Sequence, residues 1–109
     1  MDVAIDRILV ALAEPTRRAI LEAVRERPRS VTDIATDFDV SRPAVSQHLR
    51  VLSDAGLLRS QRSGRHNFYA LDLRGLATLR AYIEGFWDHV LNDFRTAAVA
   101  EAKKKRTRS

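Results

Sequence analysis

The side chains best suited to binding chemistry in this sequence are arginines between positions 41 and 66. A single acid, Asp54, opposes them there, so the stretch carries a net charge of +4. The stretch contains five arginines: Arg42, Arg50, Arg59, Arg62 and Arg65. Guanidinium groups form paired hydrogen bonds with phosphates and base edges, so this cluster suits a nucleic-acid partner. A solvated face of scattered charges is the alternative, and charge alone does not separate the two.

This positive charge is local to that stretch. The 109-residue chain has a net charge of +5, but five of its 19 basic residues follow residue 102. The remaining 14 basic residues balance 14 acidic ones, so residues 1–102 are formally neutral. The length and a hydrophobic content of 45% predict one domain with one core.

The sequence offers little evidence for a catalytic site. Ser46, His48 and Asp54 are close in the sequence, but residues two apart on a helix point about 200° away from each other, so Ser46 cannot hydrogen-bond to His48. The sequence has no cysteine, which excludes thiol nucleophiles, thiolate metal sites and disulfides. We therefore predict that the protein is not an enzyme.

The histidines do not form an evident metal site. Asp88, His89 and Asp93 offer ligands, but a closed site usually takes four, and a partner helix would have to supply the rest. We predict no metal and no other cofactor. His48 lies beside an apolar helix face and is predicted to be buried or bonded to backbone, with a phosphate contact as the alternative. His66 lies among arginines and can add to their charge.

Start and stop signals predict the helices that position these residues. Apolar residues at mixed spacings of three and four indicate a first helix over 3–12. Pro15 suits the first turn of a second helix, and Pro28 stops it.

A helix-turn-helix follows. Ser30 and Asp33 resemble a capping box that opens a short third helix. After a turn at 39–40, Ser41 can cap a fourth helix that Gly56 closes. Two helices joined by about three residues are typical of this motif.

The fourth helix has two distinct faces. At 100° per residue, Val45, Leu49 and Leu52 fall on one side and predict a buried face. The opposite side carries residue types that bind bases or phosphates in a major groove: Arg42, Ser46, Gln47 and Arg50.

Residues 57–62 and 65–71 flank the turn Ser63-Gly64 and predict a two-stranded hairpin with arginines at its tip. Asp72 can then cap a long last helix. That helix carries an apolar stripe too large for a domain of this size: Leu76, Leu79, Ile83, Phe86, Val90 and Phe94, widened by Trp87 and Leu91. Packing in a dimer explains its aromatics better than a ligand cavity does.

Three stretches resemble the ArsR-type winged-helix repressors of bacteria and archaea. They are LAEPTRRAIL at 12–21, SRPAVSQHLRVLSDAGLL at 41–58 and RSGR at 62–65, within a resemblance that covers roughly residues 3 to 94. The resemblance implies a mainly α, winged helix-turn-helix fold of about five helices with a two-stranded β-hairpin wing. Many relatives sense metals through cysteine or His and carboxylate ligands, and this chain lacks the cysteines.

The resemblance also implies residue roles. Arg42, Ser46 and Gln47 become candidates for reading bases, Ser41 and Arg50 for holding phosphates, and Arg62 and Arg65 for wing contacts. In this family the first and last helices form a homodimer. The dimer residues expected on that basis are Ile5, Ile8, Leu12, Leu79, Ile83, Phe86, Trp87, Val90 and Phe94.

The sequence thus predicts a dimeric repressor that binds double-stranded DNA at a palindromic operator. Residues 1–100 would form the DNA-binding and dimerisation domain, and 101–109 a disordered basic tail, either DNA-binding or solubilising. No apolar run approaches the roughly 20 residues of a membrane span, and the N-terminus lacks a signal-peptide pattern, so a cytoplasmic location is expected. A protein-interaction module and a regulator responsive to a small molecule remain alternatives, and no effector can be named.

Overall fold

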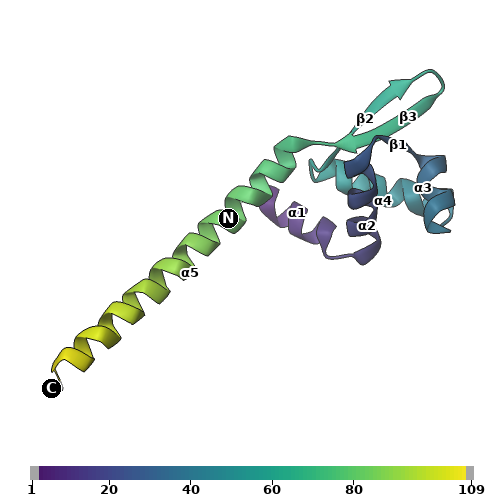
Figure 1. Cartoon of the computed structure of the whole chain (residues 1–109). Coiled ribbons are helices and arrows are strands. Elements are labelled where there is room, and N and C mark those ends of the chain that lie inside the picture. The colour runs from purple at the N-terminus through teal and green to yellow at the C-terminus, as the bar shows by residue number, and fades with distance from the viewer. Residues whose placement is uncertain (1–2, 108–109) are drawn as a thin grey trace. The chain divides into compact units, whose positions relative to one another are not determined.

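The computed structural model describes residues 3–107, with side chains as far as residue 104. The described residues form five helices and a three-stranded sheet, the winged helix-turn-helix that the sequence predicted (Figure 1). In chain order the elements are α1 (Val3–Leu12), α2 (Pro15–Glu26), β1 (Arg29–Ser30), α3 (Val31–Phe38), α4 (Arg42–Asp54), β2 (Leu58–Ser63), β3 (His66–Leu71) and α5 (Leu73–Thr107). The chain divides into two compact units, one ending at Leu79 and the other beginning at Arg80.

The junction between α1 and α2 is held by two arginines of α2. The backbone N–H of Arg17 donates to the Glu14 carboxylate over 2.9 Å, which makes Glu14 the N-cap of α2. The Arg17 Nε donates to the carbonyl of Ala11 over 2.7 Å, and Arg18 Nη1 donates to that of Leu12 over 2.6 Å. These bonds satisfy carbonyls that the end of α1 leaves unpaired, and they tie the two helices together.

The predicted capping of α3 and α4 is confirmed. Ser30 and Asp33 form a reciprocal capping box at the start of α3. Asp39 ends α3 in the left-handed region at φ 51°, and the Ser41 Oγ accepts from the backbone N–H of Ala44 at the start of α4. Ser30 and Ser41 therefore each satisfy an exposed backbone amide in the first turn of α3 and of α4.

The sheet contains one strand more than the sequence predicted. Its order is β1-β3-β2, all antiparallel, with Ser30 opposite Phe68 and Ser63 opposite His66. The hairpin of β2 and β3 runs out from the helices of this unit as the wing (Figure 1). The prediction of a two-stranded sheet missed β1 because β1 has two residues, one of which also caps α3.

The core lies where α1 to α4 meet the base of the wing. Its largest fully buried side chains come from every one of these helices and from the residue before β2: Ile8, Ile20, Ile34, Val45, Leu49, Leu52 and Leu57. Ile5 is also buried. This chain's own core covers both Ile5 and Ile8, and their predicted place at a dimer interface stays a prediction.

A close contact between two glycines fixes the start of α5. Gly56 has φ +78°, which favours glycine, and its carbonyl accepts from the backbone N–H of Gly75 over 3.1 Å. A Cβ built on Gly75 would lie 2.1 Å from the Gly56 carbonyl oxygen. Asp72 caps the helix by accepting from the backbone N–H of Arg74, as the sequence predicted.

The second unit consists of α5 beyond Leu79. The helix continues through Thr107, and so includes residues 101–107 of the tail that the sequence predicted to be disordered. Alanine and lysine, both good helix formers, dominate this end, and neither glycine nor proline follows Gly85. The last two residues of the expected tail, 108–109, lie outside the described residues.

Candidate nucleic-acid interface

The exposed face of α4 is a direct consequence of its buried face. Val45, Leu49 and Leu52 are fully buried, and they set the rotation of the helix about its axis. With that rotation fixed, the predicted contact residues Ser41, Arg42, Ser46, Gln47 and Arg50 are all exposed. The structure thus places these five side chains on one solvent-facing element.

A shallow groove marks the middle of this face. Ser46, Gln47 and Arg50 line it together with Val51 and Asp54. The polar side chains offer hydroxyl, amide and guanidinium donors, and Val51 adds an apolar surface. Such a set suits base edges, which present hydrogen-bonding groups and the thymine methyl group side by side.

The wing carries the second part of the candidate interface. Arg62 on β2 and Arg65 in the turn are exposed, and Gly64 makes the turn possible at φ +62°. The Arg62 Nε is 3.4 Å from the Gly64 carbonyl oxygen, a long hydrogen bond that leaves the other guanidinium N–H groups available. Nearby, the His66 ring packs edge-on against Phe68, with ring centroids 6.4 Å apart.

Arginines on this face differ from those elsewhere in the charge that surrounds them. Among the described side chains, Arg42, Arg50 and Arg65 form no ion pair. By contrast, Arg29 Nη1 lies 2.6 Å from the Asp37 carboxylate, and Arg74 Nη2 lies 2.9 Å from that of Asp72. The unpaired guanidinium groups are the ones positioned to meet an external anion.

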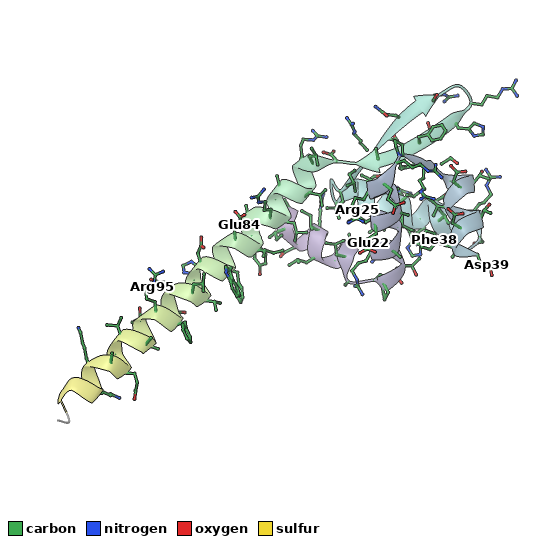
Figure 2. All side chains as sticks on the ribbon, in the orientation of Figure 1. Glu22, Arg25, Phe38, Asp39, Glu84 and Arg95 are labelled. Carbon is green, nitrogen blue, oxygen red and sulfur yellow. The ribbon has the colours of Figure 1, made fainter. Side chains whose placement is uncertain are left out.

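The surface between α2 and α3 carries both signs of charge. Glu22 and Arg25 lie on α2, and Phe38 and Asp39 at the end of α3 (Figure 2). A groove between these helices is lined by Glu22, Arg25 and Phe38 together with Arg29, which Asp37 already neutralises. This surface therefore differs from the predicted contact residues of α4, whose only charged side chains are the arginines Arg42 and Arg50.

Two capping carboxylates have perturbed acidities. The guanidinium and backbone N–H of Arg74 lower the pKa of Asp72, and the same pairing raises the pKa of Arg74. Desolvation opposes the change at Glu14, but hydrogen bonds from Arg17 and Thr16 and the nearby His48 lower the pKa of Glu14. Both groups are therefore carboxylates at neutral pH.

The structure does not assemble a catalytic triad. The His48 Nδ1 faces the Glu14 carboxylate at 3.9 Å, on the side of α4 away from the exposed Ser46. Within the described residues, no three His, Asp or Glu side chains come together in a way that could hold a metal ion.

Among the helices of residues 3–107, we find no candidate for a membrane span, which would need both sufficient length and an apolar sequence.

The remaining dimer residues divide into two groups. Leu12 and Leu79 are half-buried and pack against the core of the first unit. Exposed positions follow along α5: Ile83, Phe86, Trp87, Val90 and Phe94. Tyr82 and Val99 are further exposed apolar residues on the same helix. Periodicity left them out because, at 100° per residue, Tyr82 falls at the margin of the stripe and Val99 falls nearly opposite it.

Comparison with known proteins places this architecture in a family. The model of the bacterial regulatory proteins of the arsR family matches residues 14–60, which run from the N-cap of α2 into β2. The HTH-type transcriptional regulator Rv2034 of Mycobacterium tuberculosis is 46% identical over 89 residues, covering 82% of this chain and 83% of that protein. The chain belongs to the arsR family of bacterial regulatory proteins. It is a transcriptional regulator and not an enzyme.

Further relatives and solved structures are similar to this arsR-family chain. The transcriptional repressor SdpR of Bacillus subtilis is 33% identical over 67 residues, covering 62% of this chain and 74% of that protein. A fragment of Mb0332 from Mycobacterium bovis, described as a homodimeric winged helix-turn-helix DNA-binding domain, superposes with a TM-score of 0.65 at 28% identity. That match covers 78% of this chain and 79% of the other. It supports the winged helix-turn-helix fold of this arsR-family chain.

Proposed function

We propose that this chain is a homodimeric repressor that binds double-stranded DNA at a palindromic operator. The observation that carries the proposal is the exposed face of α4, where Arg42 and Arg50 have no internal ion-pair partner among the described side chains. The relatives named as repressors or as a homodimeric DNA-binding domain support the same function. Binding DNA in a bacterial cell implies a cytoplasmic location.

Each exposed residue takes a role that its chemistry allows. Arg42, Ser46 and Gln47 read base edges in the major groove, and Arg50 holds a phosphate. The Ser41 Oγ accepts from Ala44 as the N-cap, and its hydroxyl proton remains available for donation to a phosphate.

The wing completes the contact with DNA. Arg62 and Arg65 bind the backbone that flanks the major groove, where they add affinity without reading sequence. Residues 1–100 act in this proposal as the DNA-binding and dimerisation domain.

The dimer forms through the exposed apolar residues of α5. Phe86 and Phe94 are among the most exposed large apolar side chains of the chain. A contiguous apolar surface of this kind usually marks a contact with another protein, and a two-fold pair of identical helices covers it on both copies. Two equivalent α4 helices then face two half-sites centred about 10 base pairs apart, or a multiple of that.

The decisive experiment selects bound duplexes from random DNA with the purified protein. We expect one enriched motif with paired half-sites and salt-sensitive binding. Arg42→Ala should then lose about 1–3 kcal/mol on the selected duplex and relax the preference at particular base pairs. Binding without any preferred sequence, or a preference unchanged in Arg42→Ala, would contradict the proposal for α4.

The matched control is a wing variant. Arg65→Ala should weaken selected and unrelated duplexes to a similar extent and reduce the salt dependence by about one unit of slope for each phosphate that the wing no longer neutralises. Failure of the chain to bind any duplex, with binding to an acidic protein instead, would favour an interaction module. We propose no metal requirement, so a chelator should leave the affinity for the selected duplex unchanged.

A further inference from the structure

His48 occupies the edge between the buried and exposed faces of α4. Its side chain is 21% exposed, yet the Nδ1 atom is buried and has no hydrogen-bond partner among the described residues. A buried polar nitrogen without a partner is costly, so such atoms are usually paired. The closest acid that forms an ion pair with it is Glu14, whose Oε2 lies 3.9 Å away.

Glu14 is itself held in place as the N-cap of α2. The backbone N–H of Arg17 donates to the same Oε2 atom over 2.9 Å. Hydrogen bonds from Arg17 and Thr16 outweigh desolvation and lower the pKa of this carboxyl, so Glu14 is negatively charged at neutral pH. One carboxylate therefore lies between the start of α2 and the middle of α4.

The other charged groups near this carboxylate are occupied or exposed. Arg17 and Arg18 donate through their guanidinium groups to the last carbonyls of α1. On α4 itself, Arg50 and Asp54 are exposed. Among the described residues Glu14 is the one acid paired with His48, which makes the pair specific.

We infer that His48 is a positioning residue for DNA binding, which in its protonated form ties α4 to the N-terminus of α2 through Glu14. The inference rests on the proposed role of α4 in DNA binding. A protonated imidazole carries N–H donors at both nitrogens, and small shifts can bring a 3.9 Å ion pair to a charge-assisted hydrogen bond.

Holding α4 in place matters because Gln47 and Ser46 directly precede His48 on this helix. A helix already fixed in its bound placement loses less conformational freedom when DNA binds. Only a protonated imidazole carries the positive charge that pairs with the Glu14 carboxylate, so a comparison of two pH values tests the tie. DNA affinity should therefore contain a component that depends on pH, on His48 and on Glu14 together.

The test is a double-mutant cycle on affinity for the selected duplex, at pH 6.0 and pH 8.0 and constant ionic strength. The variants are His48→Gln, Glu14→Gln and the double variant. Glutamine at 14 keeps an oxygen that can cap α2 but has no charge, and glutamine at 48 keeps polar atoms but cannot take up a proton. Unfolding by urea, followed for each variant at both pH values, reports pairing in the absence of DNA.

We expect His48→Gln to bind about threefold more weakly than the wild type at pH 6.0 and nearly equally at pH 8.0, the size expected for a partly exposed ion pair. Glu14→Gln should behave in the same way, and the double variant should lose no more than either single one. His66→Gln is the matched control, because it removes a wing histidine and should leave the coupling between His48 and Glu14 intact.

Three results would overturn the inference. Parallel pH profiles of the wild type and His48→Gln would show that the proton on His48 plays no part. If His48 and Glu14 are coupled in the free energy of unfolding but not in DNA affinity, the pair stabilises the fold and has no role in positioning α4 for DNA. If His48→Gln fails to fold, a pH profile of Glu14→Gln identical to the wild type would contradict the inference equally. A wild type that binds no duplex at all would instead overturn the proposed function, and this inference with it.

Discussion

The unit that ends at Leu79 and the helix that begins at Arg80 differ in the exposure of their large apolar side chains. Leu49 and Leu52 of the first unit are 0% exposed, whereas Phe86 and Phe94 of the second are 63% and 73% exposed. Apolar residues in the first unit find their partners within the chain. Those of the second remain largely exposed in the part of the chain that the structure describes. The first unit should therefore fold by its own core, and the second should be completed by association.

The largest effect should follow from a cavity in the first unit. Leu52→Ala removes a fully buried side chain and should lower the free energy of unfolding by about 2–5 kcal/mol, measured by urea titration. Val10→Ala, which truncates an exposed residue of α1, is the control and should cost less than about 0.5 kcal/mol. A small loss in Leu52→Ala would mean that the buried set is not a cooperative core.

In the second unit a charge should break association and leave the first unit folded. Phe86→Asp places a carboxylate in the apolar stripe and should weaken self-association by about 2 kcal/mol or more, as loss of a central interface aromatic does. Sedimentation measures this against Asp88→Ala, a change on the opposite side of α5. A variant that remains dimeric would remove Phe86 from the interface.

Replacing a glycine by alanine should change the stability of the two units in opposite directions. Gly75→Ala puts a Cβ against the Gly56 carbonyl oxygen and should destabilise the protein by about 1–3 kcal/mol. Gly85→Ala meets nothing within 4 Å and should stabilise the helix by up to about 1 kcal/mol. Thermal unfolding followed by circular dichroism compares the two, and equal effects would contradict the close approach at Gly75.

The smallest expected effect is a loss of stability at low pH. The lowered pKa of Asp72, held down mainly by Arg74, means that its contribution to stability is present at neutral pH and is lost as the pH falls through the folded-state value. The free energy of unfolding should thus decline below about pH 4. Asp72→Asn should show a smaller decline, whereas Asp88→Asn in the second unit should follow the wild type.

The sequence predicted the parts of this fold that depend on local chemistry. Ser41, the capping box at Ser30 and the turn at Gly56 each act within a few residues, so their types and spacing are enough. The two faces of α4 followed from a helical period alone. The exposed arginines were identified by the same reasoning, although their contacts with DNA stay a prediction.

The features that the sequence did not reveal depend on contacts between residues far apart in the chain. β1 is a strand only because β3 lies beside it, about 40 residues later in the sequence. Ile5 and Ile8 belong to an apolar stripe, and periodicity shows that a stripe is covered without showing whether the same chain covers it. The facing of His48 and Glu14 was missed for the same reason, because it joins positions 34 residues apart.

The division of α4 into a buried and an exposed face has a consequence for evolution. Val45, Leu49 and Leu52 are constrained by the core, while Arg42, Ser46 and Gln47 are free of that constraint because they are exposed. Under the proposed function, mutations at the exposed positions alter what the protein recognises at almost no cost to folding. After a gene duplication, two copies could therefore diverge toward separate targets by drift on one helix face, with the scaffold inherited unchanged.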